Sequence, residues 1–308
     1  MSDLVSSSAE ATTRTARVPR LRTWHWPELL FIAPYMVFYI GLLVVPLVLG
    51  FIMSFQYFDL FDGYSEFIGF ENYQQLFADQ IFRGAVVNTF KFVIFTVPAF
   101  LIIGLLIALA LNRQTWWAAT LRTLFFASNV LSVTIVTLIW RAVYLPEKGL
   151  LVNFLDLFGL SGLAVLQDPN LALPAIAVTT VWWGIGLPMV LFLAALQQIP
   201  SEIYEAAKLD NASPWQTLWE ITIPSIWRTV VLVAIIEVIA QFQVFGQINL
   251  MTGGGPNNAT RSMVQFVYEA GFRQWTAGFA SAAAQVLFVI MILAAGLQFW
   301  ASRKKQEF

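Results

Sequence analysis

The sequence predicts an all-α integral membrane protein with six transmembrane helices. Of its 308 residues, 58% are hydrophobic and 11% are charged, and the mean hydropathy is +0.71. An average soluble domain is far more polar, with about a quarter of its residues charged. Apolar stretches long enough to cross a bilayer recur along the chain, and basic residues gather in alternate connections between them. Composition therefore gives the class, and the apolar stretches give the number of spans.

The six expected spans are apolar stretches of the length that a bilayer requires of a helix, about 20 residues or more. They cover residues 28–55, 84–111, 122–144, 171–196, 226–250 and 277–300. The first is too long for the core of a signal peptide, so we expect it to remain as a span. Together these stretches form a transmembrane domain over residues 28–302.

Charged residues orient the spans. Residues 1–27 are rich in Ser, Thr and Ala and contain four arginines, which predicts a disordered cytoplasmic tail. Basic residues are retained on the cytoplasmic side of a membrane. Of the 17 basic residues, 11 lie in the two tails or in and beside the connections that follow the second and fourth spans. The connection 56–83 has five acidic residues and one arginine, which suits the outer face. Both termini, including a short tail at 303–308, are therefore expected in the cytoplasm.

The connection 145–170 is also expected outside. Its apolar stretch at 152–166 is too short to span the bilayer. This length favours an interfacial helix that lies on the membrane surface.

A charged insert, residues 201–224, separates the fourth and fifth spans and organises the rest of the chain. We expect Ser201 to cap a short helix over 202–209. That helix is expected to end at Asp210 and Asn211. A second short helix is expected to follow, between Ser213 and Pro224.

Residues of the second helix carry clear start and stop signals. Ser213 and Gln216 have the spacing of a capping box, with Pro214 in the favoured first helical position. Pro224 is expected to end this helix. The insert is thus predicted to be a pair of helices on the cytoplasmic side.

The composition of the first helix suits a docking surface. Ala206 and Ala207 are small enough to let another protein approach closely. Glu205, Lys208 and Asp210 keep the helix out of hydrocarbon, because charged side chains are costly in lipid. The ordinary alternative is an interfacial helix-turn-helix without a partner.

The insert resembles the cytoplasmic coupling loop of ABC importer permeases, in particular the sugar-importing branch of the maltose and glycerol-phosphate type. The resemblance rests on Glu-Ala-Ala at 205–207, on Asp210 before a turn, on Ala212 and on Ile223-Pro224. Where the family has glycine, this chain has Asn211. Asparagine tolerates the left-handed turn best among the other residues, so we expect the turn to survive at about 1 kcal/mol or less.

This resemblance covers about residues 26–302 and implies the type I importer permease fold in a bacterial or archaeal plasma membrane. It implies a second homologous permease, two ATPase subunits, an extracytoplasmic solute-binding protein and membrane lipid as partners, and no nucleic acid. In the family the loop seats in a groove of the ATPase. The residues that would carry this coupling are Glu205, Ala206, Ala207, Asp210, Asn211, Ala212 and Pro224.

No cofactor is expected on this chain. Its glycine run at 253–255 is followed by Pro256 and not by the Lys-Ser or Lys-Thr of a phosphate loop. ATP and Mg would therefore belong to the partner ATPase. The string at 250–260, LMTGGGPNNAT, resembles the family's outer loop after the fifth span.

Polar residues inside the fifth span indicate a solute path, since such groups in lipid usually face a partner or a cavity. Glu237 and Gln241 lie four residues apart on one predicted helix face, Gln243 and Gln247 share another, and Asn249 is on a third. One face is expected to line the path, with Glu237, Gln241, Gln247 and Asn249 as candidates. A buried structural hydrogen bond remains the alternative for Glu237, and contact with the second permease is the alternative for the other face.

The fourth span adds two indoles beside helix-weakening residues. Trp182 and Trp183 precede Gly184, Gly186 and Pro188, which favours a broken helix of the kind that lines a cavity. Indole faces pack well against the C–H face of a sugar ring. The alternative is a kinked packing helix with an interfacial aromatic belt.

Asn88, with Thr89, matches an Asn-Thr pair of the family near the outer start of the second span, and it is a further candidate for solute contact. The solute is expected to be a sugar or a sugar-like molecule. Glycerol 3-phosphate or related phosphodiesters with the same architecture remain the alternative, followed by an ATP-independent channel. An intramembrane enzyme is not expected, because the chain has no cysteine and its one histidine, His25, lies outside the spans.

Overall fold

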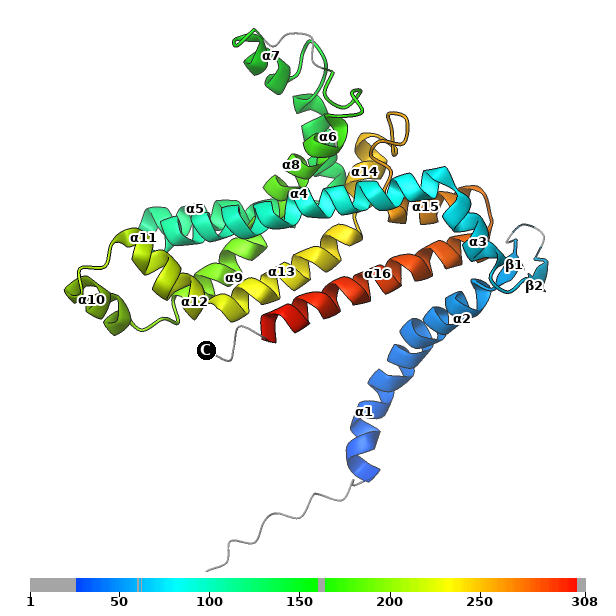
Figure 1. Ribbon diagram of the computed structural model, residues 1–308, viewed down its shortest axis with the longest axis horizontal. Helices are drawn as coiled ribbons and strands as arrows, with labels where there is room; N and C mark the ends of the chain where they lie inside the picture. Colours follow the sequence, from blue (N-terminus) through cyan, green and yellow to red (C-terminus); the bar gives the residue numbers. More distant parts are fainter. Residues whose placement is uncertain (1–25, 60, 62, 160–163, 304–308) are drawn as a thin grey trace, which may run out of the picture. The chain divides into compact units, whose positions relative to one another are not determined.

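The computed structural model of the chain (Figure 1) describes residues 26–303 other than 60, 62 and 160–163. Nearly all of the expected tail 1–27 and of the tail 303–308 thus lies outside the described residues. The all-α class is confirmed, since helices make up almost all regular structure. Within the described residues the strands are β1 (Gln56–Phe58) and β2 (Ser65–Phe67), which form one short hairpin.

Contacts divide the chain into two units, residues 1–49 and 50–308. In the first, α1 (Trp26–Tyr39) and the π-helical η1 (Ile40–Val44) lead into α2 (Val45–Met53), which continues into the second unit. The apolar helix Phe31–Met53 is long enough to span a membrane, and the chain buries none of its most apolar window. Such a helix needs lipid or another protein around it.

The second unit is built on α4 (Gln80–Leu111), an unbroken helix of 32 residues. Asp79 caps it by accepting the N–H of Ile81 at 2.6 Å. Three other helices pack along it: α8 (Ala172–Gly184), α9 (Gly186–Leu196) and α13 (Trp227–Phe242). The last helix, α16 (Ala277–Arg303), packs against α13, and Figure 1 shows α4, α13 and α16 side by side.

Packing between α4 and α9 is close. A Cβ atom placed on Gly104 would lie 2.9 Å from Cβ of Pro188, so glycine is needed at this crossing. Met189 and Phe192 fill the adjoining core with no exposed surface. This contact fixes α9 against the central helix.

The connection 56–83 is folded rather than a loop. β1 and β2 pair antiparallel with Tyr57 opposite Glu66, and α3 (Glu71–Ala78) follows. The buried Asn72 side chain ties them together, because its Nδ2 donates to the carbonyls of Ser54 and Gln56, each at 2.9 Å. Hydrophobic periodicity over so few residues is too weak to predict these elements.

The connection 145–170 contains α7 (Leu150–Asp156), a helix of seven residues. The helix expected over 152–166 is therefore shorter and begins earlier, and residues 160–163 lie outside the described residues. After α13 come α14 (Gly246–Met251), α15 (Met263–Tyr268) and the π-helical η4 (Glu269–Arg273).

Three described helices are continuous and apolar enough to cross a membrane: Phe31–Met53, Gln80–Leu111 and Ala277–Ser302. Three bent pairs would raise the number to six if each pair is one span. The predicted third span, 122–144, is not one helix. It divides into α5 (Trp116–Ala127), η2 (Ser128–Val130) and α6 (Val133–Val143), which bend by 103° at the break.

The fourth and fifth spans are also broken. α8 and α9 bend by 48° at Ile185, as Gly184 and Gly186 led us to expect. The predicted fifth span, 226–250, is wrong as a single helix, because α13 ends at Phe242 and α14 begins at Gly246. A break that tertiary packing holds is not visible in an apolar sequence pattern.

Candidate functional site

The insert folds as two short helices joined by a turn. The first, α10 (Ser201–Leu209), has Pro200 in extended conformation as its N-cap residue. Ser201 is thus the first helical residue, and the prediction that it caps the helix is wrong. Proline fixes the entry of the chain but has no side-chain acceptor, and the Ile203 N–H reaches its carbonyl at 3.2 Å.

Asn211 ends α10 in the left-handed conformation, with φ 54°. The N–H of Ala212 donates to the Ala207 carbonyl at 2.9 Å, and the N–H of Asn211 donates to the Lys208 carbonyl at 3.1 Å. These two bonds form the Schellman motif, which most often has glycine at this position. The turn predicted at Asp210 and Asn211 is confirmed.

The second helix starts with the predicted capping box. Ser213 Oγ accepts the N–H of Gln216 at 3.2 Å, and Gln216 Oε1 accepts the N–H of Ser213 at 2.9 Å. The helical segment then runs through α11 (Pro214–Gln216), η3 (Thr217–Thr222) and α12 (Ile223–Ser225).

Pro224 lies one residue before the helical segment ends at Ser225, so the predicted end of the insert is confirmed to within one residue. η3 runs into α12 without a break, and a bend beside Pro224 is what a proline within a helical segment favours. The chain bends by 69° after Ser225, before α13 begins at Trp227.

The insert exposes large apolar side chains. Leu209 is 84% exposed, Trp215 68% and Trp219 52%. The hydroxyls of Tyr204 and Thr222 lie 3.3 Å apart and join the two helices. Exposed apolar side chains gathered on a polar, folded insert are typical of a protein interface.

The two adjacent alanines differ in burial. Ala206 is exposed, whereas Ala207 is 7% exposed and is buried by this chain itself. The expectation that both leave room for another protein is therefore corrected for Ala207, whose small size serves packing within the subunit. Ala206 shares the exposed surface with Glu205 and Asp210.

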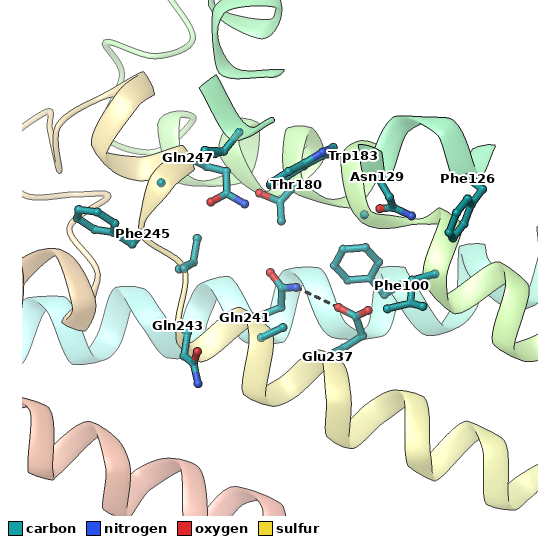
Figure 2. A pocket seen from close by; sticks show the side chains of 16 residues that line it. Phe100, Phe126, Asn129, Thr180, Trp183, Glu237, Gln241, Gln243, Phe245 and Gln247 are labelled. Carbon is teal, nitrogen blue, oxygen red and sulfur yellow. Dashed lines mark hydrogen bonds between the residues drawn. The ribbon is translucent and has the colours of Figure 1, made fainter. Parts of the chain in front are cut away.

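A cavity of about 550 Å³ opens between α4, α8 and the break after α13. Its volume lies within the range of small-molecule sites, about 300 to 1,000 Å³. Figure 2 shows its polar side chains around an open space, with aromatic rings among them. The amide and carboxyl groups in the lining belong to Asn129, Glu237, Gln241, Gln243 and Gln247.

Glu237 and Gln241 share one face of α13, as predicted. Gln241 Nε2 donates to Glu237 Oε2 at 3.0 Å, and Figure 2 shows this bond at the cavity wall. The helix break at 243–245 then turns the chain, so that Gln247 of α14 reaches the same cavity. The predicted shared face of Gln243 and Gln247 does not exist, because no single helix holds both.

On the opposite wall, the breaks of the third and fourth spans hold each other. Trp183 Nε1 donates to the Leu131 carbonyl at 3.1 Å. The Asn129 amide, in the orientation that its neighbours require, donates to the Trp183 carbonyl at 2.8 Å and accepts the N–H of Leu187 at 3.1 Å. Backbone groups freed by the two breaks are thereby satisfied.

Residues 81–307 match the family described as "Binding-protein-dependent transport system inner membrane component". The chain belongs to this family of transport permeases. It is similar to the multiple sugar-binding transport system permease protein MsmF of Streptococcus mutans, with 35% identity over 85% of this chain and 94% of that protein. The probable ABC transporter permease protein YurN of Bacillus subtilis is 31% identical over 85% of this chain and 91% of its own length.

A third relative is the sn-glycerol-3-phosphate transport system permease protein UgpA of Escherichia coli, 27% identical over 89% of this chain and 93% of that protein. Among solved structures, a bacterial ABC transporter for the acidic polysaccharide alginate aligns with a TM-score of 0.78 at 23% identity, over 91% of this chain and 96% of that chain. This likeness confirms the type I importer permease fold. By its family, the protein is a multi-pass transport permease of the inner membrane.

Three of the predicted path residues do not line the cavity: Trp182, Asn88 and Asn249. Trp182 faces a separate apolar groove and packs edge-on against Trp140, with ring centroids 5.6 Å apart. Asn88 Nδ2 donates to the carbonyls of Asn258 and Arg261, at 2.8 and 3.2 Å. Asn88 thus anchors the loop that contains Asn258 and Arg261.

Asn249 belongs to a polar cluster under that loop. Its Oδ1 accepts from Gln265 Nε2 at 3.3 Å, and the same nitrogen donates to Glu269 at 2.8 Å. Glu269 also pairs with Arg261 at 2.9 Å. These bonds hold the loop, while Arg261 Nε and Gln265 Oε1 are buried with no hydrogen-bond partner among the described residues.

Sequence reasoning missed several lining residues, among them Asn129 and Thr180, and it named Gln243 as a polar residue of the fifth span but not as a path candidate. Asn129 is a polar residue within an apolar stretch, and by the same argument that singled out Glu237 it was detectable. Within the described residues, no group of three or more His, Cys, Asp or Glu side chains is placed to hold a metal ion.

Proposed function

We propose that this permease imports a saccharide as one membrane subunit of an ATP-driven ABC importer. The similarity to MsmF, at 35% identity over 85% of the chain, carries the proposal. Two further relatives support it, since their names refer to starch degradation products and to diacetylchitobiose. A cavity lined by amides and by the Trp183 indole suits a solute that has many hydroxyls and an apolar ring face.

The proposed complex has a second homologous permease, two ATPase subunits and an extracytoplasmic binding protein that delivers the solute. ATP and Mg are bound by the ATPase subunits, and the insert 201–224 docks on one of them. Exposed Leu209, Trp215 and Trp219 support this docking, because large aromatic and aliphatic side chains anchor protein interfaces. Closure of the ATPase pair then moves the insert and opens the path.

A pair of alanine variants tests the coupling role in vesicles that contain the reconstituted complex. Ala206→Trp adds a large side chain on the exposed face, so it should lower ATP-dependent uptake while the subunit remains folded. Ala207→Trp enlarges a buried residue and should destabilise the subunit itself. Ala119→Trp, at an exposed helical alanine outside the insert, is the matched control and should leave uptake unchanged.

Full uptake with Ala206→Trp would contradict the coupling role of the insert. Uptake that needs no ATP would instead identify a channel. A complex that takes up glycerol 3-phosphate and no saccharide would favour the alternative solute, for which the similarity to UgpA is the supporting observation.

We also propose that both termini and the insert lie in the cytoplasm. The chain has no cysteine, so single cysteines can report the topology directly. Asn153→Cys, in α7, should react with an impermeant thiol reagent added outside intact cells, and Lys208→Cys should not. The opposite pattern would invert the orientation and place the insert where no cytoplasmic ATPase can reach it.

A further inference from the structure

The charge of the cavity is set by a single residue. Sixteen described residues line it, and Glu237 is the one ionisable side chain among them. The others that are polar are amides, a threonine and an indole. An anionic solute would therefore find hydrogen bonds here but no positive charge from this chain.

Glu237 forms no ion pair among the described residues. The ion pair found there joins Arg261 to Glu269. Its hydrogen-bond partner is the neutral Gln241, at 3.0 Å. A carboxyl group inside a membrane protein is costly unless it is paired or faces a water-filled path. Glu237 is buried, with 5% of its surface exposed, and in its ionised form it makes the field in the cavity negative.

Other charged groups near the path are engaged elsewhere. Arg261 is held by Glu269 under the outer loop, and Arg141 lines a different pocket next to Pro256. The guanidinium of Arg122 donates to the carbonyls of Leu111 and Arg113, each at 2.6 Å. None of these side chains lines the cavity.

We propose that Glu237 makes this cavity reject anionic solutes and accept neutral or amine-bearing ones. The inference rests on the proposed function for the kind of solute, a saccharide, and adds its charge class. It separates this permease from the relative named for sn-glycerol 3-phosphate and from the structural neighbour named for acidic alginate. Glu237 is thereby a specificity-determining residue, and Gln241 positions its carboxylate.

Charged thiol reagents of similar size test this field without knowledge of the solute. In the cysteine-free chain, Gln247→Cys places one thiol in the cavity lining. The full complex, with partner subunits made cysteine-free, is treated with a cationic or an anionic methanethiosulfonate. Clefts lined by one sign of charge change association rates by about tenfold or more. Adding Glu237→Gln should therefore lower the cation-to-anion rate ratio of this cavity thiol by about tenfold.

Two controls separate charge from structural damage. Glu237→Asp keeps the charge and should retain the high ratio. Asn153→Cys, on the exposed α7, should show the same ratio with and without Glu237→Gln. An unchanged ratio at the cavity thiol in Glu237→Gln, or an equal loss in the Asp and Gln variants, would overturn the proposal. These rates do not depend on transport, so a failure of saccharide import would be seen separately, in the uptake assay.

Discussion

Gly186 offers the sharpest test of how the broken spans pack. It is the first residue of α9 and lies where the break of the third span meets that of the fourth. A Cβ atom at this position would lie 2.5 Å from the carbonyl oxygen of Phe125, 2.6 Å from the side-chain amide of Asn129 and 2.8 Å from Cα of Phe126. Two of these atoms are backbone, so they cannot move aside by a change of rotamer.

The expected loss of stability in Gly186→Ala has two parts. Relief of the overlap requires a backbone shift, and overpacking of this kind costs about 1 to 3 kcal/mol. The shift also strains the bonds of the Asn129 amide to Trp183 and Leu187, each worth about 1 kcal/mol. Partial loss of the two bonds adds about 1 kcal/mol in total, so we expect the free energy of unfolding to fall by about 2 to 4 kcal/mol.

Gly84→Ala is the matched control. Gly84 lies in α4, and a Cβ atom there would meet nothing within 4 Å. Alanine in a helix is favoured over glycine by about 0.5 to 1 kcal/mol, so this variant should be equal to or more stable than the parent. The midpoints of thermal unfolding are compared for the parent, Gly186→Ala and Gly84→Ala, each purified in detergent and followed by tryptophan fluorescence. Equal midpoints for Gly186→Ala and the parent would refute the close packing of the two breaks.

Three further changes probe single contacts. Asn88→Asp replaces a donor that serves two carbonyls of the outer loop with a carboxylate that repels them, so limited proteolysis should cut that loop faster; an unchanged rate would mean that other contacts hold it. Asn211→Gly should leave the free energy of unfolding unchanged or raise it by up to about 1 kcal/mol, since glycine adopts φ 54° without strain, and a clear loss would contradict this account of the turn. Ser213→Ala removes the capping box and should destabilise the second helix of the insert by about 1 kcal/mol, seen as faster proteolysis there, whereas Ser225→Ala should have less effect.

The sequence predicted the class, the central helix and the insert because each leaves a local signal. The run of apolar residues in α4 is long, and the cap at Ser213 depends on side chains three residues apart. The left-handed turn at Asn211 follows from the properties of asparagine itself. Such features can be read without knowledge of what lies across the protein.

The breaks in the spans depend instead on distant contacts. The break after Phe242 has no proline or glycine until Gly246, and it is held by bonds such as Ser262 Oγ to the Val244 carbonyl at 2.8 Å. Because helical spacing was assumed through this break, Asn249 was assigned to a path that it does not line. Asn88 was assigned to solute because it matches, with Thr89, an Asn-Thr pair of the family, and its true partners lie 170 residues and more away in sequence.

The length of α4 has a mechanical consequence. Its 32 residues make a rod of about 48 Å, which exceeds the hydrocarbon thickness of about 30 Å. Leu109, near one end, lines a groove shared with Tyr204 and Thr222 of the insert, while Asn88, toward the other, holds the outer loop. If α4 rotates as a rigid helix by about 5° about one end, its other end moves by about 4 Å. A small rotation of α4 at the insert would therefore be felt as a displacement of about 4 Å at the loop that Asn88 holds.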